Sequence, residues 1–113
     1  MKSPRPYDFN QFFKVVSTSE TELFTAPSDK YRCIYAIILH DLSGTTDVNN
    51  VTFRVYKEDG ALDREFTIPL TAYATKVVTL GEKIPVLTIQ PSYVLKAITS
   101  VGNAQIMIIY LDE

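Results

Sequence analysis

Residues 31–39, Tyr-Arg-Cys-Ile-Tyr-Ala-Ile-Ile-Leu, constrain the fold more than any other stretch of the chain. Their residue types favour a β-strand. A strand with one face in water alternates apolar and polar side chains, but this one is apolar on both faces. Strict alternation places Cys33 and Ile37 on one face and Ile34 and Ile38 on the other. We therefore expect a second sheet to cover one face and something else to cover the other.

The rest of the chain reads as further short strands, with turn signals roughly every ten residues. Asp59-Gly60 is a strong hairpin signal, and no segment has a sustained helical period. The pattern predicts an all-β antiparallel β-sandwich, jelly-roll-like, with eight or nine short strands. The expected strands are residues 13–18, 21–25, 31–40, 51–57, 62–68, 75–80, 87–89, 93–100 and 105–111.

Length and composition set the class of protein. A chain of 113 residues predicts one domain, and 46% hydrophobic residues predict a folded core. The net charge is −2 and the basic residues are scattered, which disfavours nucleic-acid binding. No apolar run approaches the ~20 residues of a membrane helix, and the N-terminus lacks the apolar core of a signal peptide. We expect synthesis in a cytoplasm and no membrane partner.

Residues 1–11 are expected to form an extended N-terminal arm, followed by a single domain over residues 12–113. Pro4 and Pro6 prevent regular strand pairing. The aromatic side chains that follow either close the end of the core or dock on a neighbouring subunit. They are Tyr7, Phe9, Phe12 and Phe13.

Surplus apolar strand faces predict a partner. Residues 105–111 also lack a polar face, with Ile106 and Ile108 on one side and Met107 and Ile109 on the other. An uncovered patch of this size is unusual for a soluble monomer, so we expect a homo-oligomer unless residues 1–11 and 69–75 fold over it. The candidate interface residues are Tyr7, Phe9, Phe12, Phe13, Ile34, Ile38, Met107 and Ile109.

The sequence contains no convincing catalytic, cofactor or metal motif. His40 is the one histidine, and a triad with Ser43 and Asp41 or Asp47 has no supporting nucleophile or oxyanion motif. Cys33 is the one cysteine and is expected to be a small buried hydrophobe, so no intrachain disulfide forms. We predict that the chain is not an enzyme.

Two weaker signals lie in the polar segment after the long strand. Oxygen-bearing residues at every second position from Asp41 to Asn49 are similar to a calcium loop, although Gly44 and Thr52 break that pattern. Asn50-Val51-Thr52 is a formal glycosylation sequon, which we interpret as chance without a secretory signal.

The segment Leu23-Phe24-Thr25-Ala26-Pro27-Ser28-Asp29-Lys30, with the Ile-rich strand that follows, resembles the start of small virion proteins of tailed phages and related viruses. In layout the resemblance spans residues 19–111. It implies a β-sandwich head decoration, cementing or head-fibre protein, often trimeric, with no catalytic residues. Ser28-Asp29 departs from the commoner small-residue-plus-Gly turn.

These observations lead to an expected function. The chain is predicted to be a virion structural protein, a capsid decoration or cementing protein that self-associates, binds the major capsid protein and stabilises the shell. The alternative is a carbohydrate- or receptor-binding module of a virion, in which exposed tyrosines stack on sugar rings. The candidate tyrosines are Tyr56, Tyr73 and Tyr93.

Overall fold

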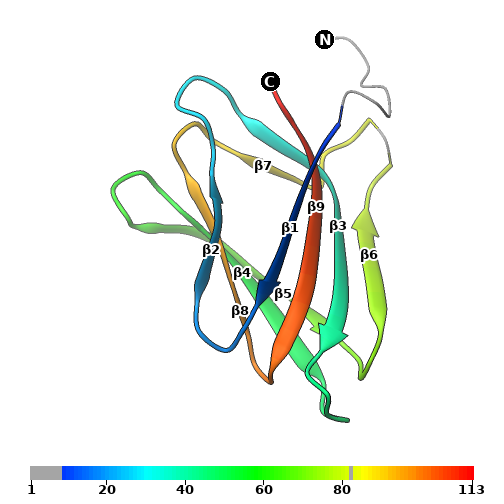
Figure 1. The fold of residues 1–113 in the computed structure, drawn as a ribbon. Helices are drawn as coiled ribbons and strands as arrows, with labels where there is room; N and C mark the ends of the chain where they lie inside the picture. The colour runs from blue at the N-terminus through cyan, green and yellow to red at the C-terminus, as the bar shows by residue number, and fades with distance from the viewer. Residues whose placement is uncertain (1–8, 82) are drawn as a thin grey trace.

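The computed structural model describes residues 9–81 and 83–113, and these form strands joined by turns, with no helix. The all-β prediction is confirmed. Two antiparallel sheets face each other (Figure 1). The strands are β1 (Asn10–Val16), β2 (Thr21–Thr25), β3 (Arg32–Leu42), β4 (Asn49–Tyr56), β5 (Leu62–Leu70), β6 (Thr75–Thr79), β7 (Leu87–Ile89), β8 (Val94–Thr99) and β9 (Asn103–Asp112).

The strand order is that of a jelly roll. The first sheet has the order β1-β9-β3-β6, with the short β7 pairing beside β3, and the second has the order β2-β8-β4-β5. Leaving out β7, the first strand pairs with the last, the second with the last but one, and so on inward, as in one long folded hairpin. Wrapping that hairpin brings β9 beside β3 and β8 beside β4, which gives the double Greek key of a jelly roll.

The core lies between the two sheets and is built from alternate side chains of the central strands. In β4 every second residue is fully buried, and β8 and β9 repeat the pattern. Phe53 is the largest fully buried side chain and stacks on Phe66, with ring centroids 5.1 Å apart. The inward face of the first sheet is supplied mainly by β3 and β9.

A β-bulge in β3 corrects the simple alternation expected for this strand. Ile34 pairs with Tyr110 and Ala36 pairs with Ile109, so Tyr35 is the extra residue. After the extra residue, each side chain of β3 points to the opposite face from the one that unbroken alternation with Ile34 would give. Ile34 therefore points into the core together with Ile37 and Leu39, whereas the sequence placed it on the same face as Ile38.

The N-terminal part of the chain joins the first sheet earlier than expected. β1 begins at Asn10 and pairs with β9 over its whole length, so the last two residues of the predicted arm lie in the sheet. β1 is an edge strand of that sheet. The rest of the predicted arm up to residue 8, including Tyr7, lies outside the described residues.

Candidate interaction surface

The outer face of the β1-β9-β3-β6 sheet, turned away from the core, is uncharged and mainly apolar where an exposed face is normally polar. Antiparallel register aligns its side chains in rows of four, one from each strand. The middle row holds Phe13, Met107, Ile38 and Val77. The rows on either side hold Gln11, Ile109, Ala36 and Thr79, and Val15, Gln105, His40 and Thr75. We call these twelve positions the apolar face.

The apolar face is open to solvent in the single chain. Phe13 is 53% exposed and Val77 is 58% exposed at the two ends of the middle row, and Met107 and Ile38 between them are partly exposed. None of the twelve positions is fully buried, and none is an aspartate, glutamate, lysine or arginine. Exposed apolar bands of this kind are typical of interaction sites in other proteins.

A hollow of about 410 Å³ indents the apolar face beside the bulge. It is lined by Phe9, Gln11, Tyr35, Ala36, Thr79, Gly81 and Ile109. Tyr35 fills one side, packing edge-on against Phe9 with ring centroids 5.1 Å apart. Its hydroxyl donates to Glu113, and burial together with that carboxylate raises the pKa of Tyr35 to about 12. Tyr35 is therefore neutral and fixed in place, and the hollow is a preformed apolar recess.

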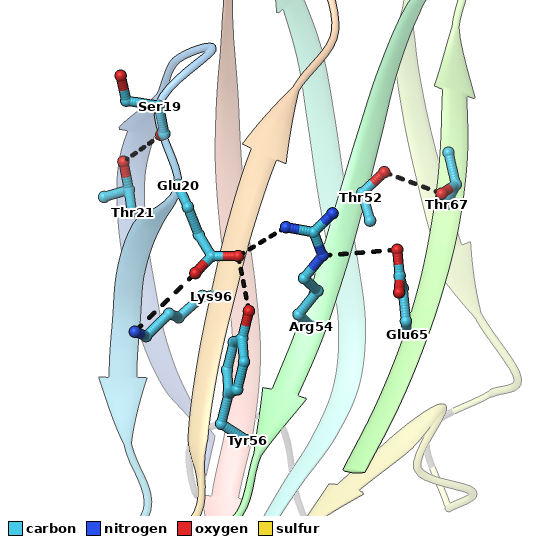
Figure 2. A network of polar contacts seen from close by, with 9 residues as sticks. All are labelled: Ser19, Glu20, Thr21, Thr52, Arg54, Tyr56, Glu65, Thr67 and Lys96. Carbon is cyan, nitrogen blue, oxygen red and sulfur yellow. Dashed lines mark hydrogen bonds and ion pairs between the residues drawn. The ribbon is translucent and has the colours of Figure 1, made fainter. Parts of the chain in front are cut away.

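The outer face of the second sheet is the opposite in character. The corresponding row across β2, β8, β4 and β5 holds four charged residues, Glu22, Lys96, Arg54 and Glu65. Figure 2 shows Glu20, just before β2, at the centre of a network of polar contacts on this face: it accepts from Arg54 and Tyr56 at 2.8 Å and lies 3.9 Å from Lys96. The hydrogen bond from Arg54 lowers the pKa of Glu20. This face is suited to water, so the two sides of the sandwich are chemically distinct.

The loop that follows β3 is organised by one buried carboxylate. Asp41 is 1% exposed and accepts from the backbone and hydroxyl of Ser43, from the Asn49 amide and from the Tyr73 backbone, at 2.9–3.1 Å. Burial opposes ionisation, but these donors outweigh it and lower the pKa of Asp41. Both carboxylate oxygens of Asp41 accept hydrogen bonds from protein donors, so a cation could bind Asp41 only if some of these hydrogen bonds were broken.

Other residues of the calcium-like segment also bond within the loop. The Ser43 hydroxyl lies 3.4 Å from that of Thr45, and the Asp47 backbone N–H donates to Thr45. Within residues 9–81 and 83–113, no group of three or more histidine, cysteine, aspartate or glutamate side chains is placed to hold a metal ion. The alternating pattern therefore serves loop geometry in this structure.

The triad considered from the sequence does not assemble. His40 and Asp41 are neighbours in β3, so they point to opposite faces of the sheet. His40 lies on the apolar face with Nδ1 2.7 Å from the Thr75 hydroxyl, whereas the Ser43 hydroxyl donates to Asp41. Cys33 is buried as expected, and burial raises the pKa of its thiol to about 11.

The predicted interface residues separate into two groups. Phe13, Ile38, Met107 and Ile109 meet on the apolar face, and Phe9 lines the hollow beside them. Phe12 and Ile34 point inward instead, Phe12 because it pairs with core residue Ile108 and Ile34 because it precedes the bulge. Tyr7 lies outside the described residues.

Sequence reasoning missed three apolar positions of this face. Val15 and Val77 lie in the two edge strands and Ala36 follows the bulge. Val15 and Val77 are each 44% exposed or more. Both edge strands contain neighbouring apolar residues, so the sequence did not reveal which of them points outward.

The three tyrosines considered for sugar binding do not converge. Tyr73 is 63% exposed and adjoins Asp41, near the Asn49 end of β4. Tyr56 is at the other end of that eight-residue strand, roughly 23 Å away at ~3.3 Å per residue. Its hydroxyl is already bonded to Glu20, and Tyr93 packs against the core.

Comparison with known proteins adds no family. No family model matches the chain, and no curated protein is detectably similar to it in sequence. Within residues 9–81 and 83–113, none of the structure is a helix of the length and apolarity needed to cross a membrane.

Proposed function

We propose that this chain is a virion structural protein that self-associates and decorates a viral capsid, stabilising the shell by bridging neighbouring capsid subunits. The apolar face is the observation that supports the proposal. It offers a broad, uncharged contact surface on one side of a domain whose other side is charged. A protein that works by contact needs such a surface.

The jelly-roll topology adds support from the fold. Jelly rolls are used by viral capsid and lectin domains, among others. A fold alone does not define a function, so this support is an analogy. It agrees with the resemblance of residues 19–111 to small virion proteins, which also implies a trimer as the assembled form.

In this proposal the segment before β1 binds the major capsid protein. In the sequence it precedes β1, an edge strand of the sheet that bears the apolar face. Its composition, with Pro4, Pro6 and Tyr7, suits an extended segment with an aromatic anchor. The loop at residues 41–50 is then free to face outward from the shell.

Co-sedimentation with empty shells tests the proposal. The shells are assembled from the major capsid protein of the virus that encodes the chain. We expect saturable binding of the full chain and an increase in the temperature at which the shells rupture. A chain lacking residues 1–8, which leaves β1 intact, should keep its melting temperature and lose binding, whereas Thr67→Lys on the charged face should bind normally.

Absence of shell binding by the full chain would contradict the proposal. Unchanged shell binding after deletion of residues 1–8 would contradict the role given to the N-terminal segment. Saturable binding on a glycan array without shell binding would instead favour the receptor-binding alternative.

A further inference from the structure

We infer that the apolar face binds the same face of a second copy of this chain, so that two chains pair about a twofold axis. The inference rests on the self-association in the proposed function, names the surface that performs it, and replaces the trimer implied by the resemblance with a pair. The contact is isologous, which means that both copies use the same surface: where one residue of the first copy contacts a second residue of the other copy, the reverse contact also forms.

The size of the face corresponds to a small pairing interface. The twelve positions and the hollow span residues 9–15 along the β1 edge, a length of ~23 Å at ~3.3 Å per residue, and four strands ~4.8 Å apart, a width of ~19 Å. The flat projection is then roughly 440 Å², and side-chain relief increases the accessible area. A standard interface buries about 800 Å² on each partner.

The charge of the face favours a second copy over a different protein. A twofold axis brings residues close to their own counterparts, so charged residues near it would repel. The twelve positions have no aspartate, glutamate, lysine or arginine, and His40 is their one titratable side chain. The row of Glu22, Lys96, Arg54 and Glu65 shows that the other sheet does not share this property.

The shape of the face offers matching parts. Phe13 projects from the middle row and is 53% exposed, and the hollow lined by Ala36 and Ile109 begins in the adjacent row. In an isologous contact, Phe13 of each copy enters the hollow of the other, and both insertions form together. An aromatic side chain in a preformed recess is the usual anchor of a protein interface.

Sedimentation equilibrium of the full chain over a wide concentration range tests the pairing. The wild type is expected at twice its mass of 12.8 kDa. Met107→Lys places a charge in the middle row and should weaken pairing ~100-fold or more. Phe13→Ala removes the projecting ring from an exposed position, so it should weaken pairing with little effect on folding. Thr67→Lys, on the charged face, should leave pairing within about twofold.

The outcomes separate this inference from the proposed function. A monomer at every concentration, a trimer, or pairing that Met107→Lys and Phe13→Ala leave unchanged would each overturn the twofold contact, whatever the shell-binding result. A pair that dissociates as expected but does not bind shells would support the contact and contradict the proposed function. Melting temperatures of the variants show that loss of pairing is not loss of folding.

Discussion

At the scale of single residues, the buried Asp41 carboxylate accepts four hydrogen bonds, from Ser43, Asn49 and Tyr73. One buried carboxylate joins the end of β3 to Asn49 at the start of β4 and to Tyr73 before β6. Its partners lie 2, 8 and 32 residues further along the chain. The segment from Asp41 to Asn49, which is similar to a calcium loop in the sequence, is in this structure a set of hydrogen bonds that links the ends of strands.

Asp41→Ala should destabilise the protein by roughly 3 kcal/mol, because several buried donors lose their acceptor. Asp41→Asn keeps one acceptor oxygen and should cost less. The measurement is the free energy of unfolding in urea. Asp47→Ala, an exposed aspartate of the same loop, is the matched control and should change it by less than about 0.5 kcal/mol. Equal changes in the free energy of unfolding for the two alanine variants would contradict this stabilising role of Asp41.

Stability should also depend on Asp41 at acid pH. Its pKa is lower in the folded chain than the ordinary 3.8, so its contribution is present above that value and is lost as pH falls through the folded pKa. Thermal melts between pH 2 and pH 6 should show a smaller acid loss for Asp41→Asn than for the wild type. Parallel curves would mean that Asp41 contributes nothing to the acid transition.

Added calcium should not stabilise the chain, because the Asp41 oxygens already accept hydrogen bonds from the protein. Thermal melts with and without millimolar calcium measure this. A saturable increase in melting temperature that Asp47→Ala or Asp41→Asn abolishes would show that the loop rearranges to bind the ion.

At the scale of elements, β3 decides which side chains reach the outside. Its two apolar faces were evident from the sequence, as were the nine strands to within a few residues. The bulge at Tyr35 was not, because nothing in Ile-Tyr-Ala-Ile marks one residue as extra. The error had a local consequence: Ile34 was assigned outward, whereas Ile38, Met107 and Ile109 were assigned to the face on which they lie. Strand order depends on pairings across the chain, which alternation does not encode.

The end of β9 is attached to β3 by a paired and stacked arginine. Arg32 donates twice to Asp112 at 2.8 and 2.9 Å, and its guanidinium lies over the rings of Phe24 and Tyr110. Because Arg32 is largely buried, Asp112→Ala should cost about 2 kcal/mol of unfolding free energy. Asp63→Ala, which removes a more exposed pair with Arg64, should cost less than ~1 kcal/mol. Similar losses of unfolding free energy in the two variants would show that the buried pair is no more stabilising than the exposed one.

At the scale of the whole molecule, the sandwich has one charged side and one apolar side, and this asymmetry is the basis of the functional account. The surplus of apolar strand faces predicted a partner from the sequence alone. The structure adds which sheet bears the surplus and aligns it in rows. The identity of the partner depends on surfaces of other molecules and so had no signal in this chain's periodicity.

Self-association through this face should be nearly independent of salt. Screening weakens contacts between charges, and the apolar face has no acidic or basic side chains except His40. Sedimentation at 0.05 and 0.5 M sodium chloride should give pairing constants within a few-fold of each other. A fall of tenfold or more would indicate a contact through the charged sheet instead.

Hydroxyl-radical footprinting read by mass spectrometry can show whether the apolar face is the contact surface, because the method reports side-chain exposure in the unmutated protein. On going from dilute to concentrated chain, modification of Phe13 and Met107 should fall several-fold, while that of Tyr73, which is 63% exposed and off this face, stays constant. Equal modification of Phe13 and Met107 at all concentrations, and on bound shells, would contradict the account.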